Sequence, residues 1–199
     1  MRDAGLLDQD GQRDRYRLGL KLFELGNTVL ANMDLHREAR PFVDALSQVT
    51  GHLVHLAVFD GQQAIVIHRV AADSGTPLTL IEAAPVHCTS VGKAILAFQP
   101  AAKIDAVVAG GLKRFTDATI VDGRKLKSEL KAIRSRGYAI DEGEHQPGIR
   151  CIGAPVHDRT GRVVAGLSVS GPARRLKKDQ MADLAKIVIH HAQLMAAKL

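Results

Sequence analysis

Two serines near the C-terminal end of the chain have the spacing of a ligand-binding pair. Ser168 and Ser170 lie in an otherwise apolar run, and residues i and i+2 of a strand point to the same face. Two hydroxyl groups on one face could bind the oxygens of a small polar ligand, and Gly166 on that face would leave room for it. A solvated sheet face is the alternative to a binding role.

A second candidate is the start of the helix predicted for residues 89–98. Thr89 and Ser90 both belong to the residue types that cap helices, and Pro100 would stop this one. The first N–H groups of a helix lack partners within it and lie at the positive end of its dipole, so they suit an anion. Capping alone explains Thr89 and Ser90 equally well, and both roles can hold together.

A predicted hairpin brings together a carboxylate and a thiol. If it turns symmetrically about Gln146, Asp141 lies directly opposite Cys151. Asp141 could accept the proton of a ligand hydroxyl, or it could repel a carboxylate, so its role depends on the ligand. For Cys151 the alternative is a small buried apolar residue, which is the commoner environment of a free cysteine.

The two cysteines, Cys88 and Cys151, form no CxxC pattern, so the sequence predicts neither a disulfide framework nor a structural zinc site. His87, Asp141 and His145 are further metal-competent residues, but their spacing matches no known ligand pattern. We expect no metal and no cofactor. A thiol oxidoreductase remains an alternative, and it would need a lowered thiol pKa.

The elements that position these residues alternate between strand and helix patterns. Residues 1–7 could finish a short helix, residues 8–12 have the composition of a turn, and residues 13–17 alternate like a strand. Hairpin-linked strands with helices between them predict an α+β fold with a central antiparallel sheet. We expect helices at 18–30, 35–49, 89–98, 101–109, 124–136 and 179–197, and strands at 52–59, 64–70, 78–81, 138–141, 148–156 and 162–170.

Length and composition favour one main domain with an appendage. The chain has 199 residues, of which 46% are hydrophobic and 24% charged. It has no apolar run of membrane-spanning length, and its charged first residues do not resemble a signal peptide, so we expect a cytoplasmic protein without a membrane partner. The absence of Trp and an aromatic content of 4% argue against a stacking platform for single-stranded nucleic acid.

The net charge of +6 arises mainly in the C-terminal part of the chain. Residues 121–199 hold 15 Lys and Arg against 8 Asp and Glu, spread over several predicted elements. The densest piece, residues 174–178 (RRLKK), is either a solvated loop before the last helix or a phosphate-binding patch.

Several stretches resemble, in order and spacing, the IclR family of bacterial transcription regulators. Each motif is weak alone, but together they are specific, and the resemblance spans roughly the whole chain. The stretches are 16–22 (YRLGLKL), 87–94 (HCTSVGKA), 136–144 (RGYAIDEGE), 151–155 (CIGAP) and 163–172 (VVAGLSVSGP).

This resemblance implies a GAF-like, effector-binding domain, a winged helix-turn-helix that binds operator DNA, and homodimers or homotetramers. We expect residues 1–17 to be the end of a recognition helix and the wing, 18–36 a linker helix, and 37–199 the effector domain. With so little of the DNA-binding domain, this chain alone should bind operator DNA poorly. A departure from the family lies at residues 82–85, where the family often has a glycine-containing turn.

The resemblance also assigns effector-binding positions. From the family resemblance, the expected function is transcription regulation in response to a small organic acid, without enzyme activity. The alternatives are an effector-independent oligomerisation domain and a GAF-type thiol oxidoreductase that uses both cysteines. The positions that the resemblance places in the effector site are Ser90, Val91, Asp141, Cys151, Ser168 and Ser170.

Overall fold

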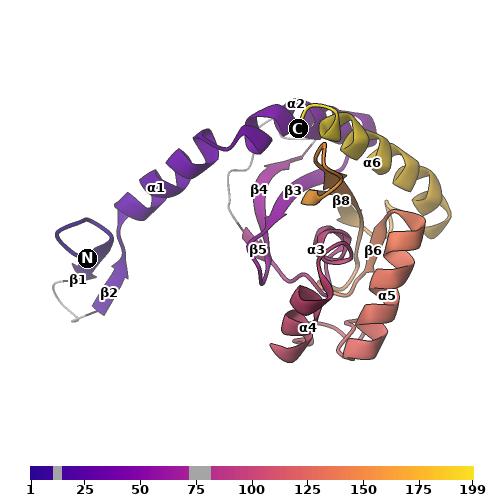
Figure 1. Ribbon diagram of the computed structural model, residues 1–199, viewed down its shortest axis with the longest axis horizontal. Coiled ribbons are helices and arrows are strands. Elements are labelled where there is room, and N and C mark those ends of the chain that lie inside the picture. Colours follow the sequence, from indigo (N-terminus) through magenta and orange to yellow (C-terminus); the bar gives the residue numbers. More distant parts are fainter. Residues whose placement is uncertain (11–14, 72–81) are drawn as a thin grey trace. The chain divides into compact units, whose positions relative to one another are not determined.

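The computed structural model describes residues 1–10, 15–71 and 82–199 (Figure 1). These residues form two compact units, Met1–Arg37 and Glu38–Leu199. The boundary between the units lies within helix α2 (Asp34–Thr50), which contains Pro41. Because proline has no N–H group, Pro41 cannot donate to the carbonyl four residues earlier, so the α2 hydrogen-bond ladder is weakened next to this boundary.

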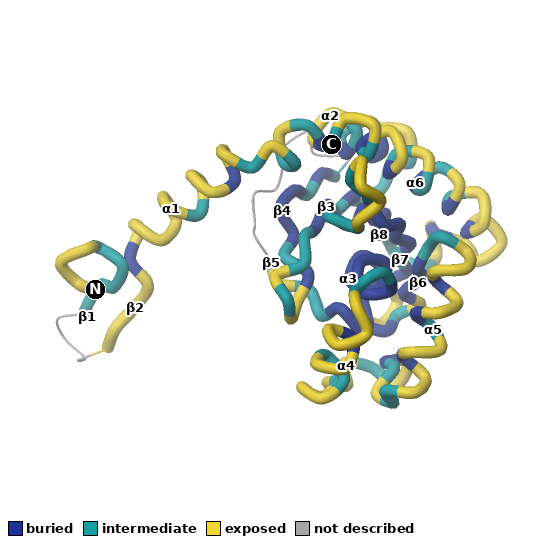
Figure 2. Tube along the Cα trace, in the orientation of Figure 1, coloured by how far each residue is buried: buried dark blue, intermediate teal, exposed yellow. Residues whose placement is uncertain are grey.

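The N-terminal unit contains a two-stranded hairpin and one helix. Strand β1 (Leu7–Asp10) pairs antiparallel with β2 (Arg15–Leu18), and helix α1 (Leu20–Ala31) follows. The expected helix end at residues 1–7 was wrong, because residues 2–6 form turns and a bend in which Gly5 adopts φ 68°, and Leu7 begins β1. The expected turn at residues 8–12 was also displaced, since residues 8–10 belong to β1. Most of α1 is exposed (Figure 2).

The second unit contains a six-stranded sheet with the order β5-β4-β3-β8-β7-β6, in which all neighbours are antiparallel. This confirms the predicted α+β class. The strand expected at 78–81 lies outside the described residues, and residues 82–84, where the sequence departs from the family, form a short strand. The strands are β3 (Leu53–Phe59), β4 (Ala64–Val70), β5 (Glu82–Ala84), β6 (Ala139–Glu142), β7 (Ile149–His157) and β8 (Val163–Pro172).

Helices pack on both faces of this sheet. Helix α3 (Ser90–Leu96) contacts β7 and β8 on the face inside the curl of the sheet, and α6 (Met181–Ala196) contacts β7 on the opposite face (Figure 1). The C-terminal half of α2 is joined to β4, since the Ser47 hydroxyl lies 3.4 Å from the Val70 carbonyl oxygen. The other helices are α4 (Ala101–Ala109), α5 (Gly123–Arg136) and the short 3-10 helix η1 (Lys178–Gln180).

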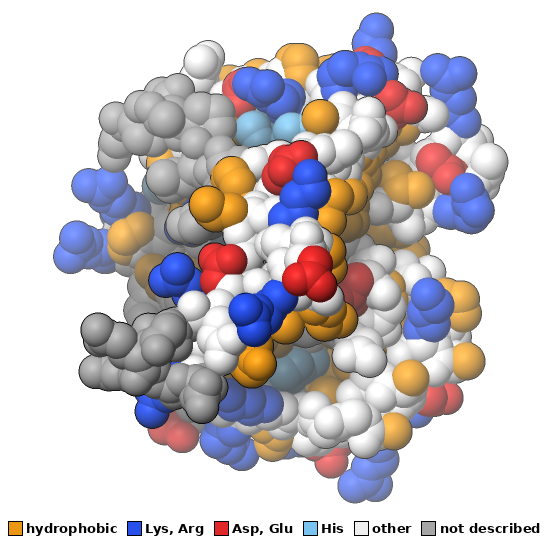
Figure 3. Space-filling model, turned by 90° about the vertical axis from the view of Figure 1, so that its left-hand side faces the viewer, with side chains coloured by type: hydrophobic (Ala, Val, Ile, Leu, Met, Phe, Trp, Pro, Cys, Tyr) orange, Lys and Arg blue, Asp and Glu red, His pale blue; other side chains and the backbone are white. Residues whose placement is uncertain are grey.

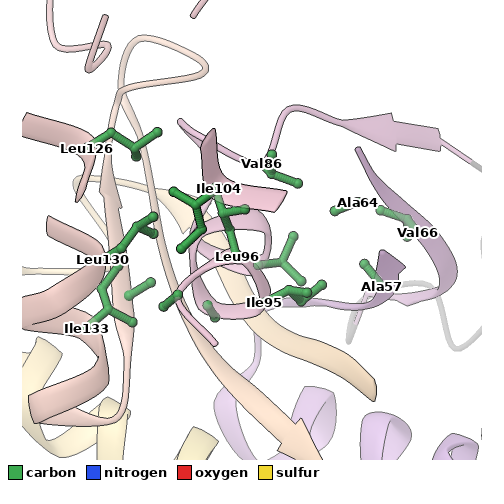
Figure 4. Packing of buried hydrophobic residues seen from close by; sticks show 14 residues of the cluster. Ala57, Ala64, Val66, Val86, Ile95, Leu96, Ile104, Leu126, Leu130 and Ile133 are labelled. Carbon is green, nitrogen blue, oxygen red and sulfur yellow. The ribbon is translucent and has the colours of Figure 1, made fainter. Parts of the chain in front are cut away.

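An apolar core fills the space between α3 and its neighbours. Leu126, Leu130 and Ile133 lie along one face of α5 at helical spacing and point toward Leu96 and Ile104 (Figure 4). On the other side of α3, apolar residues of β3 and β4 complete the same cluster. All residues of α3 are buried, so this helix is central to the core (Figure 2).

Two glycines allow the backbone of α3 to lie directly on the sheet. A Cβ atom at Gly153 would lie 2.7 Å from the Ser90 carbonyl oxygen, and one at Gly166 would lie 2.9 Å from the Val91 carbonyl oxygen. The expectation that Gly166 leaves room for a ligand was therefore wrong. Its missing side chain leaves room for the helix, because strand alternation shows which face a residue occupies but not what covers that face.

Alanine at either glycine should therefore destabilise the second unit. We expect Gly153→Ala and Gly166→Ala to lower the free energy of unfolding by about 1–3 kcal/mol each, because the added methyl group would force α3 away from the sheet. Urea unfolding monitored by circular dichroism would measure this. The matched control is Gly110→Ala, where φ is −68° and the nearest atom to the new Cβ lies 3.4 Å away. Equal stability of all three variants would contradict the close packing.

Candidate functional site

A cavity of about 390 Å³ opens on the α3 face of the sheet. Its volume lies within the range of small-molecule sites. The structure brings together around it all the positions that the sequence resemblance assigned to effector binding, namely Ser90, Val91, Asp141, Cys151, Ser168 and Ser170.

The start of α3 forms one wall of the cavity. Thr89 is the N-cap, as expected, and its hydroxyl accepts a hydrogen bond from the Gly92 N–H (3.1 Å) and donates one to the Pro85 carbonyl (2.7 Å). The hydroxyl of Thr89 is thus engaged in capping the helix. Ser90 and Val91, the first two residues of α3, line the cavity and are almost fully buried.

The floor of the cavity is a row of small polar side chains on adjacent strands. Ser170 of β8 lies opposite Cys151 of β7, which lies opposite Asp141 of β6, so the predicted hairpin register is confirmed. The Cys151 thiol donates to the Ser170 hydroxyl oxygen over 3.0 Å. Ser168 lies two residues before Ser170 and also lines the cavity. These groups offer a ligand hydroxyl oxygens and a carboxylate from three neighbouring strands.

Asp141 is held in place by the hairpin that it precedes. Its Oδ1 accepts a hydrogen bond from the Glu144 N–H over 2.6 Å, and its side chain is buried. Burial raises the pKa of Asp141, while this backbone hydrogen bond and the charge of Lys93 oppose the rise.

A buried ion pair lies beside Asp141, and sequence reasoning did not single it out. Lys93 of α3 pairs with Oε1 of Glu144, and both side chains are at least nine-tenths buried. Burial raises the pKa of Glu144 to about 7, although Lys93 acts in the opposite direction. Asp141, which lines the cavity, thus lies near a second carboxyl group and one ammonium group.

The turn that carries Glu144 is fixed by hydroxyl groups from a neighbouring loop. Thr116 Oγ1 donates to the Gly143 carbonyl (2.8 Å), and Thr119 Oγ1 donates to the Glu144 carbonyl (2.6 Å). The ring of Phe115 packs edge-on against His145, which lines the cavity, with 4.9 Å between centroids. Residues 115–119 therefore position this wall of the cavity.

The opposite side of the cavity has basic residues that sequence analysis did not identify. His55 of β3 lies between Ser168 of β8 and Arg69 of β4 in the sheet register, and all three line the cavity. Burial and the neighbouring Arg69 charge lower the pKa of His55 to about 4, so its ring is neutral at physiological pH. Arg69 and Arg175 are the two arginines among the described residues that line the cavity.

The basic stretch at 174–178 is a solvated loop with one buried anchor. Leu176 is buried, and Arg150 donates to its carbonyl oxygen, while the four basic residues around it are exposed. Arg175 from this loop reaches the cavity lining. On the face shown in Figure 3, Lys and Arg side chains are scattered among Asp and Glu rather than gathered in one patch.

The two thiols have environments that disfavour the thiolate. Burial, together with the Asp141 charge, raises the pKa of both Cys88 and Cys151 to about 12. A nucleophilic thiol needs the opposite shift. Among the described residues, no three His, Cys, Asp or Glu side chains form a group able to hold a metal ion. None of the helices in those residues combines the length and apolar character needed to span a bilayer.

Comparison with known proteins identifies the family. Residues 27–197 match the family model described as bacterial transcriptional regulator IclR C-terminal. The chain is 33% identical to the HTH-type transcriptional regulator KdgR of Escherichia coli K12, over 100% of this chain and 77% of that protein. It is 35% identical to the HTH-type transcriptional repressor AllR of Klebsiella pneumoniae, over 98% of this chain and 73% of that protein. The chain belongs to the IclR family of bacterial transcriptional regulators.

Solved structures agree with this assignment. The crystal structure of the Thermotoga maritima IclR matches with a TM-score of 0.82 and 33% identity, covering 100% of this chain and 81% of that one. The C-terminal domain of E. coli KdgR matches with a TM-score of 0.75 and 31% identity, covering 83% of this chain and 98% of that one. The sequence-based recognition of the family is confirmed.

Removing Lys93 should destabilise the protein in a pH-dependent way. We expect Lys93→Met to lose about 3–5 kcal/mol of unfolding free energy at pH 8, because Glu144 would be left buried and unpaired. A carboxyl group whose folded-state pKa is raised costs stability as the pH rises through that pKa. The loss should therefore be smaller at pH 5, where Glu144 is protonated. Urea unfolding at both pH values would measure it.

The control for this experiment is the double variant Lys93→Met/Glu144→Gln, which removes the unpaired charge and should recover part of the loss. A loss in Lys93→Met that is the same at pH 5 and pH 8 would show that packing, rather than charge, is responsible.

Both thiols should resist alkylation in the folded protein. With a pKa near 12, the thiolate fraction at pH 8 falls on the order of 10³-fold below that of an ordinary cysteine. We expect iodoacetamide to label neither Cys88 nor Cys151 within an hour, as measured by mass spectrometry. Urea-unfolded protein is the control and should label at both. Rapid labelling of one thiol in the folded state would revive the oxidoreductase alternative.

Proposed function

We propose that residues 37–199 sense a small organic acid and thereby control DNA binding by a winged helix-turn-helix, of which residues 1–17 are the end. The observation that carries this proposal is the convergence of six residues from α3, β6, β7 and β8 on one cavity. They come from distant parts of the sequence, and their hydroxyl, thiol and carboxyl groups meet in one cavity beside the apolar core.

Regulation rather than catalysis is the better-supported role. The similar proteins are named transcriptional regulators and repressors. The raised thiol pKa values leave the cavity without an activated nucleophile of the kind that a thiol oxidoreductase requires. Because operator DNA and metabolites meet in the bacterial cytoplasm, we place the protein there.

Assembly with a second copy is part of this proposal. Helix α1 exposes several large apolar side chains, and of its residues only Leu30 is buried. A stripe of this kind favours a partner helix, which supports a homodimer or homotetramer. An effector-independent oligomerisation domain is the second candidate function, because the same exposed helix would serve it.

Ligand binding should raise the melting temperature of the protein. An acid at about 100 times its dissociation constant stabilises the native state by about 2.7 kcal/mol, which corresponds to roughly 5–10 °C for a chain of this length. We expect such a rise with at least one acid in a thermal-shift panel of keto, hydroxy and aromatic acids. The rise should be abolished in Ser168→Ala/Ser170→Ala.

The matched control is Ser128→Ala/Ser135→Ala, which removes two exposed hydroxyl groups from α5 and should retain the full shift. No shift with any acid would refute the sensing function for this ligand class and favour the oligomerisation domain.

A further inference from the structure

The polar side chains on the floor of the cavity form two rows across the sheet, and the rows differ in how far their hydrogen bonds are already made. We propose that the carboxylate of the effector binds between His55 and Ser168, whose ring N–H and hydroxyl group both donate to it. This inference rests on the proposed sensing function. It adds the position of the acid group and a specificity-determining residue, His55.

The row formed by Ser170, Cys151 and Asp141 is largely occupied by bonds within the protein. These residues lie opposite one another on β8, β7 and β6. The Cys151 thiol donates to the Ser170 hydroxyl oxygen. The carboxyl group of Asp141 accepts the backbone N–H groups of Glu144 and His145. The thiol and the carboxyl group of this row are thus engaged before any ligand enters.

The row formed by His55 and Ser168 is open. The two residues lie directly opposite each other on β3 and β8, and both line the cavity. Neither side chain hydrogen-bonds to any other part of the chain that the structure describes. Ser168 is only 2% exposed, so its hydroxyl group faces the cavity rather than the outer surface. A buried hydroxyl group needs a partner, and a ligand oxygen in the cavity can be that partner.

The register allows both side chains to bind the same ligand atom. Residues directly opposite each other on antiparallel strands have Cβ atoms about 4.5–5.5 Å apart. The imidazole ring of His55 extends beyond its Cβ atom, so its N–H group and the Ser168 hydroxyl group can address one oxygen between them. A carboxylate oxygen accepts two hydrogen bonds readily.

The charges around this row favour an anionic oxygen. Burial and the Arg69 charge lower the pKa of His55 to about 4, so at physiological pH the ring is neutral and has one N–H donor. The positive charge of Arg69 therefore acts on this row through space, although Arg69 has interactions of its own and is not needed as a ligand contact. Arg175, exposed in its loop and also lining the cavity, adds positive charge that attracts an anion from solvent.

Isothermal titration calorimetry on the full chain can test this inference. The probes are 2-oxobutanoate, 2-hydroxybutanoate and benzoate, together with any further acid that raises the melting temperature in the thermal-shift panel. We expect at least one acid to bind, and His55→Leu and Ser168→Ala each to weaken it at least tenfold. His55→Gln, which keeps an N–H donor, should weaken it less than His55→Leu. The double variant His55→Leu/Ser168→Ala should lose less than the product of the two single losses, because both groups hold the same oxygen.

The nitrogen resonances of the histidine rings give a second readout, which does not depend on any variant folding. We expect the bound acid to move the ring resonances of His55, which a spectrum of His55→Gln identifies. Those of His190, exposed on α6, should stay in place. The matched control for calorimetry is His190→Leu, which should keep full affinity. Melting curves without ligand check that each variant folds.

Two results would overturn this inference while leaving the sensing function intact. One is an acid that binds the unaltered chain and His55→Leu equally well, or, if His55→Leu does not fold, leaves the ring resonances of His55 in the unaltered chain unchanged. The other is a loss in the double variant equal to the product of the single losses, which would separate the two groups. If no acid binds in calorimetry and none raises the melting temperature, the sensing function itself is refuted, and this inference with it.

Discussion

The cavity depends on the contact between the backbone of α3 and two glycines of the sheet. At Gly153 and Gly166 the helix lies so close that no side chain fits between them. Because α3 is only seven residues long, it covers only part of that sheet face. The part that it leaves open, next to its first residue Ser90, is the floor on which Ser168 and Ser170 lie. The position of one short helix thus decides both where the core ends and where the cavity begins.

The same helix also sets the electrostatic character of one end of the cavity. Lys93 extends from α3 to Glu144, so the helix is joined by a buried ion pair to the turn after β6. A buried pair of this kind contributes little net stability, but breaking it is costly, so it fixes the arrangement of the groups around it. Asp141, whose carboxyl group accepts the Glu144 N–H, is positioned by this arrangement. At the other side of the sheet, the ladder between β3 and β4 positions His55 and Arg69.

Much of this site could be predicted from the sequence, because strands alternate with a period of two. The pairing of Asp141 with Cys151 followed from the symmetry of the hairpin, and the shared face of Ser168 and Ser170 followed from their spacing. Arg69 could not be placed in this way. The register of β3 and β4 shifts between Leu56 and Ala57, so simple alternation fails along β4.

The pairing of two further residues could not be predicted from the sequence, for a different reason. Lys93 and Glu144 are 51 positions apart, and a charged residue on an amphipathic pattern is normally read as solvent-exposed. Nothing in the local sequence indicates that each is the other's partner.

The two walls of the cavity also differ in how they are held. The Arg69 wall belongs to the strand ladder between β3 and β4, whereas the turn after Asp141 is held by side chains, namely the hydroxyl groups of Thr116 and Thr119 and the ammonium group of Lys93. Segments with few backbone ladder bonds open at lower free energy than strands. The turn after Asp141 is therefore the wall of the cavity that we expect to open at the lower free energy.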